Sequence, residues 1–326
     1  MKALIFDQPN KPVVADIQMP TIGDNEVMVR SRRVGICHSD YELLSGNYII
    51  PISYPVTPGH EWVGEVVEVG RNVKGLRPGD RVVGECVIRT PERIHHFGFS
   101  MDGANREFFA ARPEWLHKLP DGVDDAKGAL IEPFTCGYYA VLRHGRVDAS
   151  QTVVVSGGGT IGLVSAAAAI GMGAQVIVVD PVPLRRQIAM KLGAVGTVDP
   201  AAGNAVEAVT EMTRGGADLV IEAAGHPASL ANVFDYARPE GFVSMVGISI
   251  GQKIPVELGK IQIKDLTVRG CIGSPGVWPA AIRFLERTGI DLSPIQTHSF
   301  ALDDAIEAFS LGKDPSKAVK ITLEIA

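Results

Sequence analysis

Hydrophobic and polar positions follow two different patterns along the chain. Up to about residue 146, short apolar runs mixed with polar residues are separated by turn signals. Examples are the segments 26–29, 61–69 and 81–83, the last of which follows a Pro-Gly-Asp turn at 78–80. Short strands of this kind with frequent turns predict an irregular, mostly β domain.

From about residue 151 the pattern changes to apolar strands that alternate with helical segments. Strands are expected at 152–157, 175–180, 194–200, 218–225 and 241–247, and helices at 161–172, 183–193, 202–213 and 228–237. Continuous apolar strands alternating with helices predict a doubly wound parallel sheet covered on both faces, the α/β class. A further strand at 266–273, a helix at 279–288 and a segment at 301–311 lead to a closing strand at 318–325, which we expect to return to the first domain. The predicted domains are 1–147 with 276–326, and 148–275.

Composition limits the classes of function. A chain of 326 residues is long enough for two domains. Its net charge of −6 argues against nucleic acid or an anionic membrane as the main partner, because both require a basic surface. Neither a transmembrane stretch nor a signal peptide is visible, so a cytoplasmic location is expected. The four cysteines show no short paired spacing, which favours free thiols.

A glycine-rich turn follows the strand at 152–157 and opens a helix. In this context the first glycine permits a tight turn, the second lets backbone N–H groups approach a pyrophosphate, and the third lets helix and strand pack closely. An aspartate ends the next strand, where its carboxylate would accept hydrogen bonds from the adenosine ribose and repel a 2′-phosphate. NAD is therefore favoured over NADP, although Arg185 and Arg186 stand nearby and an arginine can hold that phosphate. The expected cofactor-binding residues are Gly157, Gly159, Thr160, Ile161, Gly162, Asp180 and Arg185. The alternative is a doubly wound sheet that binds no dinucleotide.

Three short motifs in the first domain carry the residue types that a catalytic zinc takes. They are GICHSD at 35–40, GHEW at 59–62 and IEPF at 131–134. Each alone has an ordinary explanation, because a single cysteine is often buried in a core and a loop histidine is often solvated.

Together these motifs identify a family. GICHSD, PGHEWVG, PGDRV, LHKLPD, IEPF, the GGGTIG turn and the closing strand resemble the zinc-dependent medium-chain dehydrogenase/reductase superfamily over essentially the whole chain. The resemblance implies a GroES-like β domain with a Rossmann domain inserted before the C-terminal return. It also implies that Cys37 and His60 bind a catalytic zinc, with Glu132 as the third ligand. Cys136, four residues further on, is a weaker candidate for that place.

Glu61 adjoins His60 at the start of a strand, where neighbouring side chains point to opposite faces, so only irregular backbone would let both reach one ion. One thiolate, one neutral histidine and one carboxylate neutralise Zn²⁺, whereas a second carboxylate would weaken its Lewis acidity. We therefore expect that Glu61 and Glu132 do not both bind tightly at once.

Many relatives also carry a structural zinc on four closely spaced cysteines after the PGDRV turn. Here the matching region, 85–109, contains only Cys86, with His95 and His96 nearby, and these do not form a closed tetrahedral set. We expect one zinc per chain, with the two histidines at the surface.

The resemblance implies reversible oxidation of an alcohol, with hydride transfer to NAD. Ser39 matches the proton-relay hydroxyl of the family. Glu42 stands where relatives often have a histidine, and it would substitute in the relay unless water does so. Glu61 is also a catalytic candidate. Asp40 is expected to be a structural acid that holds a zinc ligand in place, rather than a catalytic residue.

The forms GHEW and IEPF are similar to those of sorbitol, sugar-acid and cyclitol dehydrogenases, which suggests a polyhydroxylated substrate without naming one. The alternatives are a zinc-free quinone or enoyl reductase of the same superfamily and a non-catalytic binding protein on this scaffold. By resemblance the chain is expected to be a homo-oligomer, a dimer or tetramer, that pairs near residues 266–272.

Overall fold

The computed structural model describes residues 1–48, 52–90, 93–247 and 253–325. The chain divides into two compact units, unit 1 with Met1–Glu132 and Gln296–Ala326, and unit 2 with Pro133–Ile295. The expected boundaries lay at 147/148 and 275/276, so unit 2 takes residues at both of its ends that were assigned to the first domain. Aromatic packing explains the difference, because Phe134 and Tyr138 contact Phe284 with ring centroids 6.1 and 5.5 Å apart.

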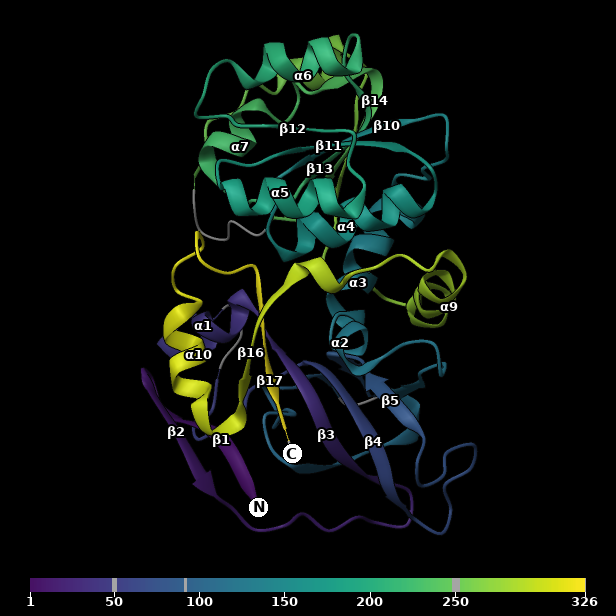
Figure 1. The fold of residues 1–326 in the computed structure, drawn as a ribbon, viewed down its shortest axis with the longest axis vertical. Coiled ribbons are helices and arrows are strands. Elements are labelled where there is room, and N and C mark those ends of the chain that lie inside the picture. Colours follow the sequence, from purple (N-terminus) through teal and green to yellow (C-terminus); the bar gives the residue numbers. More distant parts are fainter. Residues whose placement is uncertain (49–51, 91–92, 248–252, 326) are drawn as a thin grey trace. The chain divides into compact units, whose positions relative to one another are not determined.

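Unit 1 is built on a mixed sheet whose strand order is β16-β17-β3-β4-β5-β9, with β8 also paired to β3 (Figure 1). The turn signals of the sequence separate these strands, and most inward positions are Val, Ile, Leu or Phe. The strands are β3 (Val27–Ile36), β4 (Glu61–Val69), β5 (Arg81–Gly84), β8 (Phe108–Ala111), β9 (Leu116–Lys118), β16 (Gln296–Ala301) and β17 (Lys320–Glu324).

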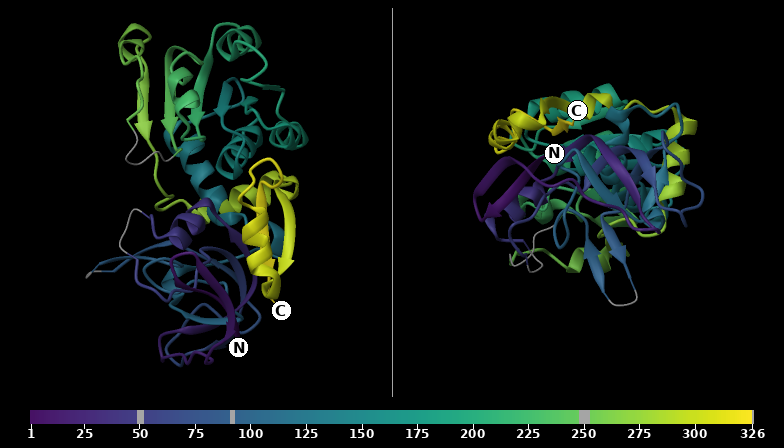
Figure 2. Two further views of the ribbon diagram at one scale, coloured as in Figure 1. Left: turned by 90° about the vertical axis from the view of Figure 1, so that its left-hand side faces the viewer. Right: turned by 90° about the horizontal axis from the view of Figure 1, so that it is seen from below.

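Among the described residues of unit 1 there are also two short hairpins, three α-helices and two 3-10 helices, at Pro113–Trp115 and Leu302–Asp304. The hairpins pair β1 (Lys2–Gln8) with β2 (Lys11–Asp16) and β6 (Val87–Arg89) with β7 (Ile94–His96). The helices are α1 (His38–Ser45), α2 (Asp125–Gly128) and α10 (Ala305–Leu311), and α3 (Ile131–Tyr138) begins at the boundary. The N-terminal and C-terminal strands both belong to this unit, so its chain is discontinuous (Figure 2).

Unit 2 contains a six-stranded parallel sheet in the order β12-β11-β10-β13-β14-β15. Its strands are β10 (Thr152–Ser156), β11 (Gln175–Val179), β12 (Gly196–Val198), β13 (Ala217–Glu222), β14 (Ala237–Met245) and β15 (Thr267–Gly270). Helices α4 (Thr160–Gly171) and α5 (Pro183–Leu192) cover one face, and α6 (Ala205–Thr213) and α7 (Pro227–Asn232) the other (Figure 1). The central strands are buried on both faces, as their continuous apolar runs predict.

One predicted helix in this unit is present but shorter than expected. A helix was expected over 228–237, but α7 ends at Asn232 and β14 already begins at Ala237. Ala237 pairs with Ala217 before a shift in register, and this early pair extends β14 to residues before its apolar run at 241–247. The remaining helices of the unit are α8 (Gly259–Ile263) and α9 (Trp278–Thr288), and a π-helical turn spans Tyr139–His144. Within the described residues, no helix combines the length and apolar character needed to cross a membrane.

Candidate functional site

Three potential metal ligands meet in unit 1, at one end of the paired strands β3 and β4. The ligand atoms of Cys37, His60 and Glu61 all lie within 4.8 Å of one another, and His60 and Glu61 are almost fully buried. A thiol, an imidazole and a carboxylate around one point are the donor types that zinc takes at a catalytic site. Among the described residues no other group of three such side chains was found.

Local backbone geometry brings these three residues together. Cys37 caps the N-terminus of α1, where Asp40 accepts a hydrogen bond from the Cys37 N–H at 2.8 Å. Gly59, directly before His60, has φ +102°, a left-handed conformation that favours glycine. His60 lies outside β4, which begins at Glu61, so the alternation of side chains along a strand does not separate these two neighbours.

Asp40 supports the histidine as well as the cysteine. Its Oδ1 lies 3.5 Å from His60 Nδ1. Both atoms are buried, and neither makes a hydrogen bond of good geometry to any other described group. Burial lowers the pKa of His60, but the neighbouring Asp40 carboxylate and the Cys86 thiol outweigh it and raise that pKa well above its ordinary value. Because Asp40 faces Nδ1, the other ring nitrogen of His60, Nε2, is the one suited to bind a metal. Asp40 would then orient the ring.

Glu61 has a buried cationic partner that the sequence analysis did not find. Lys320 Nζ lies 2.5 Å from Glu61 Oε2 and donates to the Ile36 carbonyl oxygen at 2.8 Å, and both charged side chains are at most 2% exposed. Gly35, opposite Glu61 in the β3–β4 register, makes room for the carboxylate, because a Cβ at this position would overlap Glu61 Oε2. The strands β17, β3 and β4 are neighbours in the sheet (Figure 1), which lets Lys320 on β17 reach Glu61 on β4.

Glu132, the third ligand implied by the resemblance, lies near the cluster but outside the set that meets within 4.8 Å. It stands in the first turn of α3. Burial raises the pKa of Glu132, with His60 opposing this rise and Glu61 adding to it. Glu132 is therefore within electrostatic reach of the cluster, whereas Cys136, one turn further along α3, does not join the described ligand group.

An aromatic wall adjoins His60. The Phe99 ring lies 4.7 Å from the His60 ring, and Tyr48 stacks on Phe99 at 4.6 Å with an interplanar angle of 12°. Burial raises the pKa of Tyr48 to about 12. Of the expected relay residues, Ser39 and Glu42 are both half-buried on α1, directly after Cys37.

The region that would carry a structural zinc forms the β6–β7 hairpin instead. His95 and His96 are half-buried on β7, and Arg93 Nε donates to His95 Nε2 at 3.1 Å. Cys86 turns toward the Phe97 carbonyl oxygen, and burial raises its pKa to about 12. Cys86, His95 and His96 do not form a ligand group in the part of the chain that is described.

The glycine turn of unit 2 has the backbone that the motif predicts. Gly157 has φ +104°, and a Cβ on Gly162 would overlap the Gly157 carbonyl oxygen, so the third glycine lets helix and strand touch. Gly159 caps α4 without a side chain, and Thr160 and Ile161 open the helix. The N-terminus of α4 is therefore suited to an anion such as a pyrophosphate.

Asp180 stands directly after β11, as expected, but its carboxylate already has protein partners. It accepts hydrogen bonds from the N–H groups of Gly158 and Val182, each at 2.7 Å, and is 2% exposed. Arg185 Nη1 lies 3.4 Å from it, and Arg186 donates to the Asp180 carbonyl oxygen. Asp180, Arg185 and Arg186 thus lie together at the end of β11, where the adenosine ribose of a dinucleotide is expected to bind.

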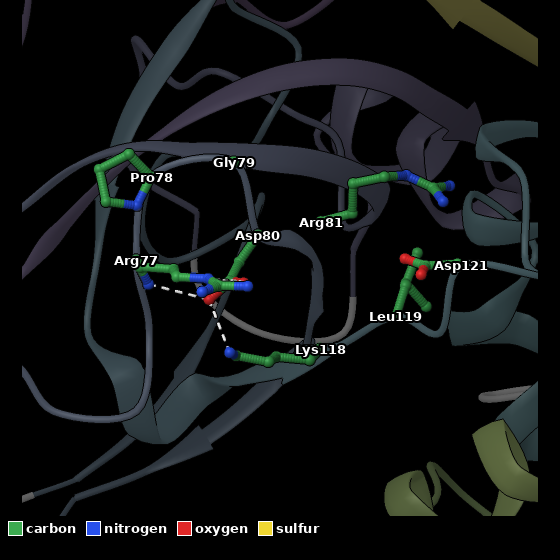
Figure 3. Close-up of a pocket in the computed structure, with 8 residues that line it drawn as sticks. All are labelled: Arg77, Pro78, Gly79, Asp80, Arg81, Lys118, Leu119 and Asp121. Atoms are coloured by element: carbon green, nitrogen blue, oxygen red, sulfur yellow. Dashed lines mark hydrogen bonds and ion pairs between the residues drawn. The ribbon is translucent and has the colours of Figure 1, made fainter.

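A surface hollow of about 430 Å³ lies at the Pro-Gly-Asp turn before β5, between Arg77 and Asp121 (Figure 3). Each cation at its rim has a carboxylate partner. Lys118 pairs with Asp80 at 2.7 Å, Arg77 with Asp80 at 3.7 Å, and Arg81 with Asp125 at 2.7 Å. The hollow contains none of the candidate ligands, and its charges are balanced within the protein.

Known families and relatives match both units. A model described as "Alcohol dehydrogenase GroES-like domain" matches residues 23–121, and one described as "Zinc-binding dehydrogenase" matches residues 160–287. A sorbitol dehydrogenase of Halalkalibacterium halodurans is 31% identical and covers 99% of both chains. The chain belongs to the zinc-dependent medium-chain dehydrogenase superfamily.

Other relatives of this superfamily differ in the substrate that they are named for. An L-threonine 3-dehydrogenase of Alteromonas mediterranea is 31% identical over 95% of both chains. The crystal structure of 2R,3R-butanediol dehydrogenase from Bacillus subtilis superposes with a TM-score of 0.90 at 30% identity, covering 99% of both chains. The family and the GroES-like and Rossmann fold classes predicted from the sequence are confirmed. The chain is an oxidoreductase of the alcohol and polyol dehydrogenase type that acts on a small molecule, and the comparisons favour this over the zinc-free reductase and the binding protein.

Proposed function

We propose that this protein is a zinc-dependent dehydrogenase that oxidises a secondary alcohol group of a polyhydroxylated substrate with NAD. The observation that carries the proposal is the convergence of Cys37, His60 and Glu61 in one unit of a chain whose other unit has the full dinucleotide turn. Bound zinc supplies Lewis acidity that lowers the pKa of an alcohol, and the dinucleotide takes up the hydride.

Cys37 and His60 would hold one catalytic zinc together with a single carboxylate. Glu61 is already neutralised by Lys320, and Glu132 stands within electrostatic reach. We infer that Glu132 is the carboxylate ligand while Glu61 stays paired to Lys320, so that the two do not both bind the zinc tightly at once. We expect one zinc per chain, because Cys86, His95 and His96 at the β6–β7 hairpin do not form a second ligand group among the described residues.

Ser39 would pass a proton from the alcohol toward solvent, with Glu42 or water as the next carrier. Its position two residues after Cys37, at the start of α1, supports this role. Asp40 would keep the His60 ring in place for the metal. Tyr48 and Phe99 would form one wall of the substrate site, with the Tyr48 hydroxyl available to a substrate hydroxyl.

The preference for NAD follows from the buried Asp180 carboxylate, which would repel a 2′-phosphate. Arg185 would contact the adenosine ribose once a bound cofactor competes for Asp180. Gly157, Gly159 and Gly162 would shape the pyrophosphate cradle, with the N–H groups of Thr160 and Ile161 facing the anion.

The test is a substrate panel with a metal control. Purified protein is assayed for NADH formation on simple alcohols, vicinal diols, polyols, cyclitols and L-threonine, with NAD or NADP, before and after chelation and zinc repletion. We expect zinc-dependent activity that is highest on polyols with NAD, and one zinc per chain by elemental analysis. Full activity after complete zinc removal, or two zinc ions per chain, would contradict the proposal.

We also propose that the protein is a homo-oligomer that pairs through β15. This strand is the edge of the parallel sheet, its residues are exposed, and exposed Ile263 and Ile272 flank it. An unpaired edge with flanking apolar side chains is suited to pairing with a second copy. In sedimentation velocity, Val268→Asp with Ile272→Asp should give monomers, whereas Ile94→Asp, at an exposed isoleucine of unit 1, should not.

A further inference from the structure

A buried glutamate joins three loops at the carboxyl edge of the unit 2 sheet. Glu222 ends β13 and is fully buried. In the β10–β13 register it lies opposite Ser156, the last residue of β10 and the one directly before the glycine turn. Chain order reverses between these two strands, and ligands of such sheets bind in the crevice outside the carboxyl ends at this point.

The Glu222 carboxylate binds the loop that follows its own strand. It accepts hydrogen bonds from the N–H groups of Ala224 at 3.1 Å and Gly225 at 3.0 Å, and from the Ser229 hydroxyl at 2.7 Å. Ser229 lies in turn 2.8 Å from the Ser156 hydroxyl. A continuous polar chain therefore runs from the glycine turn, through α7, to Glu222.

The same residue also fixes the end of β14. The Glu222 carbonyl oxygen accepts from the N–H groups of Val246 and Gly247, each at 2.8 Å. A Cβ on Gly247 would overlap Glu222 Oε2 and the Gly225 nitrogen, so the two loops touch at the carboxylate. On the other side, a Cβ on Gly157 would come within 2.7 Å of the Ala224 nitrogen.

These contacts place Glu222 on the far side of the glycine turn from Asp180. A doubly wound sheet binds the two halves of a dinucleotide on opposite sides of its switch point. Asp180 follows β11 and belongs to the adenosine side, so the loops after β13 and β14 belong to the nicotinamide side.

We propose that Glu222 is a positioning residue that holds the loops after β10, β13 and β14 in the shape that receives the nicotinamide half of the cofactor. The proposal rests on the dinucleotide site proposed above and adds a residue to it. The Oε1 atom accepts the three hydrogen bonds given above, and Oε2 accepts a further one from the Gly225 N–H at 3.3 Å. In Glu222→Gln one of the two positions becomes an amide nitrogen that only donates, and the oxygen that remains is uncharged, so these hydrogen bonds are lost or weakened. Burial raises the pKa of Glu222, and its hydrogen bonds oppose that rise.

The experiment compares the affinities of the full-length protein for NADH and for AMP, which contains only the adenosine half. NADH binding is followed by the change in its own fluorescence, and AMP binding by calorimetry. Glu222→Gln should raise the NADH dissociation constant about 10- to 100-fold, the effect of losing one or two hydrogen bonds to a charged acceptor. AMP affinity should stay within about twofold. Ser229→Ala, which breaks the link to Ser156, should give the same pattern at about 3- to 10-fold.

Asp218 provides the matched control. It is an aspartate near the opposite end of β13, where it accepts from the Thr152 N–H at 2.8 Å and from Arg238 Nε at 2.7 Å. Asp218→Asn removes a carboxylate from the same strand, so it should alter thermal stability without changing the ratio of NADH to AMP affinity. A general structural role for Glu222 would instead lower both affinities in step.

The outcomes separate the two proposals. If the unchanged protein binds NADH and both Glu222→Gln and Ser229→Ala bind it equally well, the positioning role is overturned and the dinucleotide site stands. An equal loss of NADH and AMP affinity in Ser229→Ala also overturns it, even if Glu222→Gln fails to fold. If the unchanged protein binds neither ligand, the dinucleotide site fails, and the positioning role with it.

Discussion

Replacing Lys320 with methionine removes the ammonium group from a buried ion pair while keeping a side chain of similar length. Glu61 would then hold a carboxylate that is 1% exposed and has lost its cation at 2.5 Å. Removing one partner of a buried pair costs about 3–5 kcal/mol, because the remaining charge stays desolvated. The Ile36 carbonyl oxygen loses its donor as well. We therefore expect metal-free Lys320→Met to lose about 3–5 kcal/mol of unfolding free energy in unit 1.

Urea unfolding of chelator-treated protein, followed by tryptophan fluorescence, measures this loss. Trp62 and Trp115 report on unit 1, and replacing Trp278 with phenylalanine in every variant removes the signal of unit 2. The double variant Lys320→Met with Glu61→Gln should recover at least about 2 kcal/mol, because no uncompensated charge is left. Lys317→Met is the control, since Lys317 pairs with Asp314 at the surface, and it should stay within about 0.5 kcal/mol.

Zinc links this pair to the proposed site. Without Lys320, the Glu61 carboxylate is free to bind the metal, so zinc affinity should rise about tenfold or more, equivalent to about 1.4 kcal/mol. Competition with a chromogenic chelator gives that affinity. A loss of stability below about 1 kcal/mol in Lys320→Met, or a double variant no more stable than the single one, would refute the reasoning.

Three further predictions concern unit 2. Gly162→Ala places a Cβ against the Gly157 carbonyl oxygen, so NADH affinity in a fluorescence titration should fall more than about 100-fold, and unchanged affinity would contradict the packing argument. Asp180→Ala removes the carboxylate expected to repel a 2′-phosphate, so the ratio of NAD to NADP affinity should fall at least about tenfold by calorimetry, and a constant ratio would exclude that role. Burial and the nearby Arg269 lower the pKa of His144, so the unfolded chain takes up a proton below about pH 6.5 that the folded chain does not. The unfolding free energy should therefore fall as the pH is lowered from 6.5 to 5, by at most about 2 kcal/mol for one proton, and His144→Phe should remove this contribution in urea titrations.

Local patterns in the sequence were enough to predict most of the fold. The run EWVGEVVEV predicted the bounds of β4, and the apolar runs with their glycine turn predicted the alternation of strands and helices along unit 2, though not the order of its strands in the sheet. The short helix α1 was not predicted, because its cap is a cysteine and its eight residues are too few to show a period. The domain boundaries also differ, since they depend on aromatic contacts between segments far apart in the chain, such as Phe134 with Phe284.

The candidate site was predictable only in part, because it too depends on contacts between segments that are far apart in the chain. Cys37 and His60 stand in motifs that can be read locally, but the conformation of the backbone around His60 could not be read from them. Lys320 could not be paired with Glu61, because 259 positions separate them and a lysine in a strand is ordinarily taken as exposed. Lys320 could have been recognised as buried from its place in the apolar strand KITL. A buried charged residue requires a partner of opposite charge.

The return of β17 to β3 has a consequence for the order of assembly. Every strand of unit 2 lies within one continuous stretch of chain, so that unit can fold from contacts among its own neighbours. Unit 1 can be completed only after the whole of unit 2 has been synthesised, because β17 pairs with a strand 284 positions earlier. Until then the edge of β3 that pairs with β17 is exposed, and the Glu61 carboxylate lacks its partner Lys320. A fragment of residues 1–132 would carry both defects permanently, so we expect it to aggregate during expression even though it contains every proposed zinc ligand.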